Sequence, residues 1–197
     1  DRMYMLFDRG QVTGDAINES QLIDVTQNEL QESSITEQVT GLLTELYDPA
    51  NYGWYIRLEN SGEKMLAPPV VYFGQVFYTT YAPLVGQVKD CEVGNLGVSR
   101  LYHLDYRTGE AVFDYDNTNN GDYSTESKQR ALGEDGAILK KSDRVRTLGE
   151  GIPSGIVTLI DASGKVTMMI SASNRVGTYQ APDAKLITPV YWMQWND

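Results

Sequence analysis

The stretch "SRLYHLDYRTGEAVFDYD", residues 99–116, decides the fold of this 197-residue chain. Its first half alternates apolar and polar side chains, which is typical of a strand, and Thr108-Gly109 can form a tight turn before a second short run. The stretch "RMYMLFDRG", residues 2–10, resembles that first half, because both begin Arg-x-Tyr-x-Leu and continue to an Arg and a Gly. A strand that recurs after about a hundred residues indicates a repeated β-sheet unit.

A second pair of segments shares another order of sequence features. "PPVVYFGQVFYTT" (68–80) and "IPSGIVTLIDASGKVTMMIS" (152–171) each place proline before an apolar strand, a glycine turn and a second strand. Gly74-Gln75 and Ser163-Gly164 stand at the turns, where glycine readily adopts the positive φ of a tight hairpin. Both segments therefore predict β-hairpins.

The order of these elements predicts an all-β fold. Strands are expected at residues 2–8, 53–58, 66–73, 75–81, 99–106, 110–115, 154–161, 165–171, 175–180 and 187–195. Four strands within residues 66–115, in about fifty residues, are typical of one propeller blade. We therefore expect residues 1–197 to form the C-terminal portion of one β-propeller domain, with about two to three four-stranded antiparallel blades. Such a piece leaves open sheet edges, so the rest of the propeller or an N-terminal chain is an expected partner.

Two insertions interrupt the strands, at about 17–52 and 116–150. The first contains an expected helix over residues 35–47, with Ser34 and Glu37 as a capping box. Asp48-Pro49 ends this helix. Its apolar residues recur on one face, and they are Ile35, Val39, Leu42, Leu43 and Leu46. The second insertion is polar and dotted with glycine, so we expect a long surface loop.

Composition narrows the possible partners. The chain has 16 basic and 27 acidic residues, a net charge of −11, and 41% hydrophobic residues. This charge disfavours binding to nucleic acid and to anionic membranes, and no apolar run reaches the length of about 18 residues that spans a bilayer. The chain begins at Asp1 without a signal peptide, which favours a processed protein or a fragment. Cys91 alone cannot form an internal disulfide; it is either a buried thiol or paired outside this chain.

The motifs resemble those of a known family. "SRLYHLDYRTGEAVF" is similar to the repeat of quinoprotein-type propellers, and three longer segments resemble the PilY1 family of type IV pilus tip proteins. These segments are "GWYIRLENSGEKMLAPPVVYFGQVFYTTYAP" (53–83), "CEVGNLGVSRLYHLDYRTGEAV" (91–112) and "GIPSGIVTLI" (151–160), and "PVYWMQW" (189–195) fits the closing strand of the family. The resemblance spans roughly residues 1 to 195, and the order of the motifs makes it specific.

The resemblance implies a secreted or cell-surface protein at the pilus tip, associated with minor pilins and with pilus assembly and retraction. Adhesion in the family belongs to an N-terminal region, which is not recognisable in this sequence. Some members bind calcium in a propeller loop.

The segment "DYDNTNNGD", residues 114–122, is the candidate calcium loop. Calcium takes six to eight oxygen ligands, and oxygen-bearing side chains alternate here; they are Asp114, Asp116, Thr118, Asn120 and Asp122. The family loop has the form D-x-[DN]-x-D-G-x-x-D, whereas this loop has Thr118 at position five and Gly121 at position eight. The alternative is a solvated loop in which Asn and Asp make their own backbone turns.

Other candidate residues favour structural roles. His103 lies inside a predicted strand without a nucleophile motif nearby, and Asp105 and Glu110 flank the Thr108-Gly109 turn. Three tryptophans could line a ligand groove or pack between blades; they are Trp54, Trp192 and Trp195. The amphipathic helix 35–47 could bind a partner or pack on its own propeller. "LGEGIPSG" (148–155) lacks the Gly-Lys-Ser/Thr ending of a phosphate loop and precedes a strand.

Three functions stay open at this point. The first is a non-enzymatic pilus tip module that binds minor pilins. The second is a fragment of a quinoprotein-type propeller dehydrogenase, which would need a full ring and a cofactor cavity. The third is an extracellular interaction domain of another surface filament.

Overall fold

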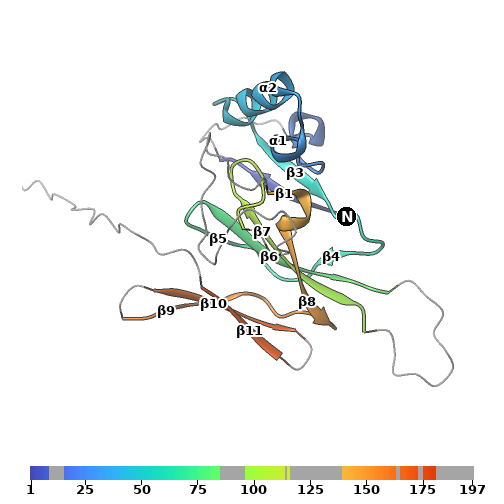
Figure 1. The fold of residues 1–197 in the computed structure, drawn as a ribbon, viewed down its shortest axis with the longest axis vertical. Coiled ribbons are helices and arrows are strands. Elements are labelled where there is room, and N and C mark those ends of the chain that lie inside the picture. The colour runs from blue at the N-terminus through green and yellow to red at the C-terminus, as the bar shows by residue number, and fades with distance from the viewer. Residues whose placement is uncertain are drawn as a thin grey trace, which may run out of the picture.

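The computed structural model describes residues 1–8, 16–84, 96–113, 115, 139–162, 165–172 and 175–180. These residues form a mostly β structure with two short α-helices and three open sheets (Figure 1). The strands are β1 (Arg2–Leu6), β2 (Ile23–Asp24), β3 (Gly53–Arg57), β4 (Lys64–Met65), β5 (Val70–Tyr72), β6 (Gln75–Ala82), β7 (Val98–Asp105), β8 (Val145–Glu150), β9 (Val157–Ile160), β10 (Val166–Ala172) and β11 (Arg175–Gln180). The helices are α1 (Glu29–Glu32) and α2 (Thr36–Tyr47), and the 3-10 turns are η1 (Glu19–Gln21) and η2 (Lys141–Arg144).

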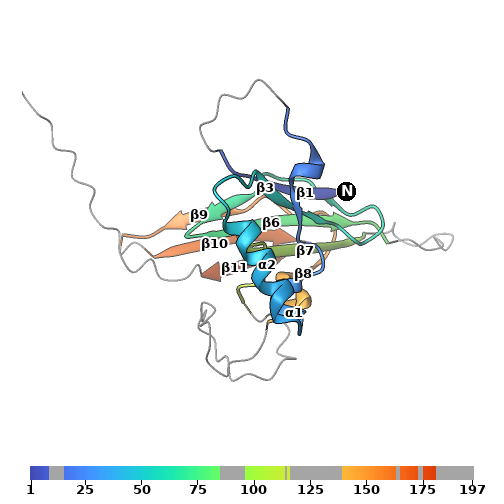
Figure 2. The ribbon, with the colours of Figure 1, turned by 90° about the horizontal axis from the view of Figure 1, so that it is seen from above.

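The N-terminal sheet has the order β1-β3-β2. β3 is antiparallel to β1 and parallel to β2, so β3 is the central strand and most of it is buried. The two helices lie over this end of the molecule (Figures 1 and 2). Leu46 of α2 is fully buried, and Val39, Leu42 and Leu43 pack against the same core, which confirms the predicted apolar face except at Ile35, which is exposed.

The start of α2 differs from the prediction. Ile35, not Ser34, is the N-cap residue, and no side chain caps the helix there. The nearest side-chain contact comes from Ser33, whose Oγ accepts a 3.2 Å hydrogen bond from the backbone N–H of Ile35. The predicted capping box of Ser34 and Glu37 is therefore wrong.

The central sheet has the order β4-β6-β7-β8, and β5 also pairs with β6. β5 and β6 form the predicted hairpin, with Tyr72 opposite Gln75 and two residues between them. The turn residues are Phe73 and Gly74, not the predicted Gly74-Gln75, and both have positive φ, at 47° and 74°. A two-residue turn in which both residues have positive φ twists in the same sense as the flanking strands.

One edge strand of the central sheet comes from an unexpected segment. β8 pairs antiparallel with β7 across the second insertion, so residues 145–150 are a strand and not part of a surface loop. The predicted strand 110–115 is reduced to a single bridge between Ala111 and Leu104. The prediction that residues 66–115 form the sheet by themselves is therefore wrong: β8 and β4, which both lie outside this range, are strands of the same sheet.

β7 leaves little free edge for residues 110–115, because it pairs with β6 along one edge and with β8 through Val98–Tyr102 along the other. Ala111 is also bound from its other side, by α1. The side-chain amide of Gln31 donates to the carbonyl of Ala111 and accepts from its N–H, each at 2.9 Å. The two bonds pair the backbone groups of Ala111 that point away from β7, so Gln31 lies where a further strand would otherwise pair.

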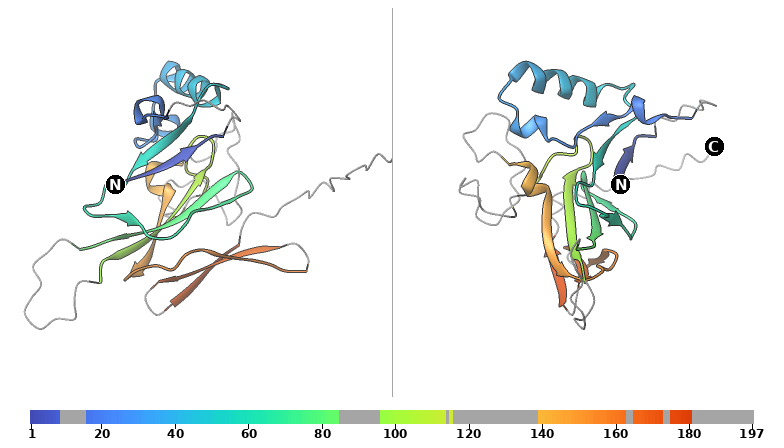
Figure 3. Two further views of the ribbon diagram at one scale, coloured as in Figure 1. Left: turned by 180° about the vertical axis from the view of Figure 1, so that it is seen from behind. Right: turned by 90° about the vertical axis from the view of Figure 1, so that its right-hand side faces the viewer.

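The C-terminal sheet has the order β11-β10-β9. Burial alternates along β10, which places Val166, Met168 and Ile170 on the covered face. This hairpin sheet lies at the opposite end of the molecule from the helices (Figures 1 and 3).

Two apolar cores cover the two faces of the central sheet. One contains Val76 and Tyr78 of β6 with side chains of the N-terminal sheet and the helices. The other contains Phe77 of β6 and Leu101 of β7 with the covered face of β10. The period-two alternation of a strand sends successive side chains to opposite faces, so the central sheet packs against a sheet on each side. The predicted dependence of the central sheet on neighbouring sheets is confirmed.

Candidate functional site: a basic cleft between two sheets

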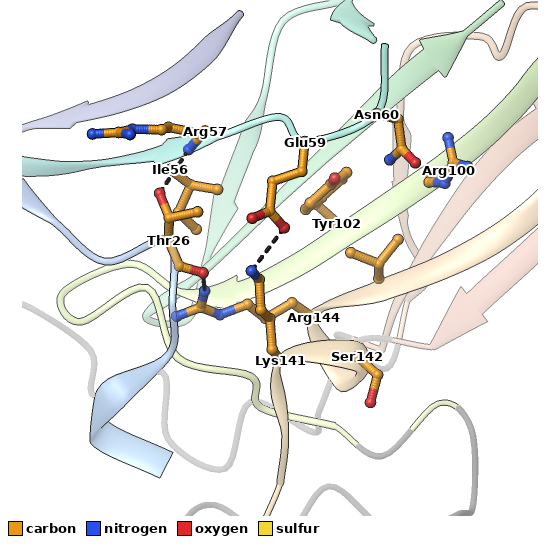
Figure 4. Close-up of a pocket in the computed structure, with 11 residues that line it drawn as sticks. Thr26, Ile56, Arg57, Glu59, Asn60, Arg100, Tyr102, Lys141, Ser142 and Arg144 are labelled. Atoms are coloured by element: carbon orange, nitrogen blue, oxygen red, sulfur yellow. Dashed lines mark hydrogen bonds and ion pairs between the residues drawn. The ribbon is translucent and has the colours of Figure 1, made fainter. Parts of the chain in front are cut away.

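A cleft of about 370 Å³ opens where the N-terminal sheet meets the central sheet (Figure 4). Its walls come from four places: Thr26 shortly after β2, the end of β3 with the following turn, β7, and the η2–β8 segment. The lining residues are Thr26, Ile56, Arg57, Glu59, Asn60, Arg100, Tyr102, Lys141, Ser142, Arg144 and Val145. Segments far apart in sequence therefore build this site.

Arg144 forms the inner wall of the cleft. Its side chain is 3% exposed, and Nη1 donates to the backbone carbonyls of Val25, at 2.8 Å, and Thr26, at 3.1 Å. Burial lowers the pKa of Arg144 to about 10, which leaves the guanidinium charged at neutral pH. Arg144 thus ties η2 to the N-terminal sheet and brings a positive charge into the protein.

The mouth of the cleft is bridged by an ion pair. Lys141 Nζ lies 2.7 Å from Glu59 Oε2, so η2 and the turn after β3 are joined across the opening (Figure 4). The side chains are 30% and 52% exposed. A pair at this exposure contributes at most about 1 kcal/mol and opens readily.

A buried carboxylate lies behind the cleft. Glu63 is 1% exposed, and its oxygens accept hydrogen bonds from Thr80 Oγ1 at 2.6 Å, from the Tyr102 hydroxyl at 3.1 Å and from the Asn60 amide. Arg100 Nη1 lies 3.9 Å from Glu63 Oε1. Burial, and then the charge of Glu63, raise the pKa of Tyr102 well above its usual range, so this phenol stays protonated and serves as a donor.

The charge of the cleft is opposite to that of the chain. Four lining side chains are cationic and only Glu59 is anionic, although the whole chain carries −11. Arg57 is partly neutralised by Asp24, at 2.8 Å. A small concave site with several charged donors can hold one anionic group.

His103 is a core residue of the central sheet, as predicted. It is fully buried and stacks on Phe77, with ring centroids 4.2 Å apart. Nε2 lies 2.8 Å from Gln75 Oε1 and Nδ1 lies 2.9 Å from the Tyr115 hydroxyl. Since the Gln75 oxygen can only accept, Nε2 carries the proton and Nδ1 accepts from Tyr115. Burial lowers the pKa of His103 to about 3, so the ring is neutral near pH 7.

The two carboxylates beside the Thr108-Gly109 turn also have structural roles. Asp105 Oδ1 accepts from the backbone N–H groups of Arg107 and Thr108, at 2.8 and 2.9 Å. Glu110 Oε2 accepts from the Thr108 hydroxyl at 2.9 Å. Both side chains therefore hold the turn.

Trp54 packs inside the protein and lines no groove. It is fully buried in the core between the N-terminal and central sheets, and Nε1 donates to the carbonyl of Tyr106 at 2.9 Å. This agrees with the predicted packing between sheets.

Several predicted residues lie outside the described residues, so their geometry is not tested. They include Trp192, Trp195, Cys91 and all five candidate calcium ligands, Asp114, Asp116, Thr118, Asn120 and Asp122. In the part of the chain that the structure describes, no group of three or more His, Cys, Asp or Glu side chains could hold a metal ion.

Sequence reasoning missed the cleft. One signal was available: residues 140–146, "KKSDRVR", contain four of the basic residues in an otherwise acidic chain. A local reversal of charge often marks a binding surface. What no pattern in the sequence indicated was that Arg57 and Arg100 would face the same opening.

Comparisons with known proteins give one structural likeness. No family model and no curated protein matches the chain. The fold is similar to the crystal structure of the Pseudomonas aeruginosa PilY1 C-terminal domain, with a TM-score of 0.46 and 14% identity over 92% of this chain. The match covers 37% of that chain, so the present sequence spans well under half of its length. Among the described residues, no helix is both long enough and apolar enough to cross a membrane.

Proposed function

We propose that this chain is a non-enzymatic, type IV pilus tip-associated protein of the PilY1 kind. It binds minor pilins outside the cell, supports pilus assembly and retraction, and takes part in adhesion through the larger protein. The observation that carries the proposal is the order of PilY1-like motifs in the sequence. These motifs fall on consecutive elements: Gly53-Trp54-Tyr55 opens β3, Gly62 precedes β4, Thr79-Thr80 lies in β6, and the Leu-Tyr strand is β7.

The packing of the sheets supports a propeller as the parent fold. The central sheet is covered on both faces, as a blade is covered by its neighbours. β8 and β11 each lack a strand partner on one side among the described residues. Unpaired edges of this kind are stabilised when further strands add to them. We infer that the rest of a propeller, in the same protein or in an associated chain, covers these edges.

The environment of the single histidine gives it a structural role. His103 is neutral at pH 7 and both ring nitrogens are engaged, so it is not poised for acid–base chemistry. A quinoprotein dehydrogenase would show the visible absorbance of a bound quinone in the purified protein.

Calcium binding is a separate part of the proposal. It rests on the family resemblance and on the oxygen-rich composition of residues 114–122. Calorimetric titration with calcium, after treatment with a chelator, tests it. Heat that disappears in a variant with Asp114 and Asp116 changed to Asn supports the site, and no heat at millimolar calcium contradicts it.

The experiment that tests the main proposal is copurification. A tagged form of the protein should retain minor pilins from cells that assemble type IV pili, and deletion of its gene should reduce surface pili. A tagged chain that retains none of the minor pilins, together with unchanged piliation after deletion, would contradict the proposal.

A further inference from the structure

The cleft between the N-terminal and central sheets holds charged donors that the fold does not use fully. Arg144 is almost completely buried, yet its Nε makes no hydrogen bond within the described residues. Arg100 Nη1 is also buried without a hydrogen bond there, since Glu63 Oε1 lies 3.9 Å away. Buried donors are nearly always paired in folded proteins. Both side chains line the cleft while these two nitrogens lie beneath its surface, so a change of side-chain rotamer would present them to an acceptor that enters.

The cleft also shows what kind of acceptor it favours. Glu59, a carboxylate of the chain itself, already bridges the mouth to Lys141. The single hydroxyl proton of Tyr102 is already donated to Glu63, whereas Asn60 and Ser142 add neutral polar groups to the walls. These are the donors with which proteins commonly bind a carboxylate.

We propose that this cleft binds one carboxylate of a partner protein segment, either an Asp or Glu side chain or a C-terminal carboxylate. The ligand displaces Glu59 from Lys141 and reaches toward Arg100. This inference deepens the proposed binding function and rests on it, because it assumes that a protein partner is held.

Charge and size favour a single carboxylate over a phosphate or a polyanion. Glu63 lies directly behind Arg100 and Tyr102, so its charge repels a dianion more strongly than a monoanion. A volume of about 370 Å³ accommodates one or two residues of a peptide. The net charge of −11 repels extended polyanions such as nucleic acid.

The ion pair at the mouth provides a matched pair of variants. Lys141→Gln and Glu59→Gln break the same ion pair and therefore share its structural consequences. They differ in the charge that remains in the cleft. Lys141→Gln removes a donor for the ligand, whereas Glu59→Gln removes the internal competitor. The proposal predicts opposite effects on affinity.

The test is a titration of the full chain with three acetylated pentapeptides, followed by nuclear magnetic resonance. Gly-Ser-Glu-Ser-Gly-amide carries a side-chain carboxylate, Gly-Ser-Gln-Ser-Gly with a free C-terminus carries a terminal one, and Gly-Ser-Gln-Ser-Gly-amide carries none. Inorganic phosphate is a fourth probe. Lys165→Gln serves as the control, since it is an exposed residue outside the cleft and makes the same change in net charge.

The expected result is binding of at least one carboxylate peptide, with shifts at Arg100, Tyr102 and Ser142, and no binding of the neutral peptide. Lys141→Gln weakens this binding about three- to tenfold and Glu59→Gln strengthens it by a similar factor. A change of this size corresponds to the loss or gain of one charge-assisted hydrogen bond to the ligand. Lys165→Gln leaves it unchanged.

Three results would overturn the inference: no shifts at the cleft with either carboxylate peptide, tighter binding of phosphate than of both peptides, or changes in the same direction for Lys141→Gln and Glu59→Gln. Copurification of pilins is measured separately. Pilin binding with an inactive cleft would refute only the present inference, whereas peptide binding without pilins would refute only the proposed function.

Discussion

The hydroxyl of Tyr102 donates a 3.1 Å hydrogen bond to Oε1 of Glu63, and this bond joins the exposed cleft to the interior of the central sheet. Tyr102 lines the cleft, while Glu63 is almost completely buried. Tyr102 also stacks on Tyr78 in the neighbouring strand, with ring centroids 4.7 Å apart and an interplanar angle of 8°. The shape of the cleft is thus fixed by a polar contact on one side and an aromatic contact on the other.

Loss of the buried carboxylate should be costly. Glu63→Ala leaves the Thr80 and Tyr102 hydroxyls without their acceptor and Arg100 without its nearby charge. Breaking such a buried network by removing one member lowers the free energy of unfolding by about 3–5 kcal/mol. Urea denaturation measures this, with Glu59→Ala as the exposed control, for which a change within about 1 kcal/mol is expected. Equal effects for the two variants would show that the Glu63 network does not stabilise the fold.

The stability of the protein should decrease in mild acid because of His103. Its pKa is lowered to about 3 in the folded state by burial, below the ordinary value of 6.5, so the unfolded chain binds the proton more readily. Its contribution to stability is complete above pH 6.5 and is lost as the pH falls toward 3, with a slope of up to about 1.4 kcal/mol per pH unit.

The matched variant for this effect is His103→Gln, which is polar and does not titrate. Unfolding free energies of both proteins between pH 5 and 7 isolate the histidine, since carboxylates contribute equally to each. A shallower dependence in the variant is expected. Identical pH dependence in the two proteins would mean that His103 titrates normally in the folded state.

The Thr108-Gly109 turn should not accept a side chain. Gly109 has a φ of 69°, and a Cβ atom there would lie 2.7 Å from Val25 Cγ2 and 3.5 Å from the Trp54 ring. Gly109→Ala combines the left-handed conformation with overpacking and should cost about 2–4 kcal/mol. Gly41→Ala in α2 is the control, because outside the helix's own backbone and the neighbouring residues no atom lies within 4 Å of its Cβ position. Helix propensity predicts a gain of about 1 kcal/mol. Thermal unfolding of both variants measures these changes. A Gly109→Ala variant as stable as the natural protein would contradict the turn geometry.

The β5–β6 hairpin contains an unfavourable residue at its turn. Phe73 has a φ of 47°, is half exposed and touches Tyr72 with ring centroids 4.7 Å apart. Phe73→Asn should raise the free energy of unfolding by up to about 1 kcal/mol, because Asn adopts positive φ more readily. Phe73→Ala is the comparison, since it loses the ring contact without this gain. If Asn were no more stable than Ala, backbone conformation would not limit this turn.

Local patterns in the sequence predicted the strands that alternate clearly and the hairpins that join them. β1, β3, β6, β7, β9, β10 and β11 coincide with predicted strands within a few residues. The expected run 66–73 is shortened to β5, because Pro68 and Pro69 lack the N–H groups that a sheet requires. The two prolines thus explain why the strand begins later than the apolar pattern predicts.

Contacts between distant segments account for the remaining differences. The sequence "VRTLGE" of β8 is short and charged, and it becomes a strand only because β7 is available to pair with it. In the same way, Gln31 of α1 takes the place of a strand beside Ala111. The cleft depends on the pairing of β7 with β8, since β7 and the η2–β8 segment form two of its walls, which is why its residues could not be assembled from the sequence.

The central claim, that the chain binds minor pilins, is tested most directly by measuring the affinity between the purified protein and each purified minor pilin from the same organism. Surface plasmon resonance with Lys141→Gln and Lys165→Gln beside the natural protein also reports whether the cleft takes part. Saturable binding to at least one minor pilin is the predicted result. No binding to any of them, with protein shown by circular dichroism to be folded, would contradict the account.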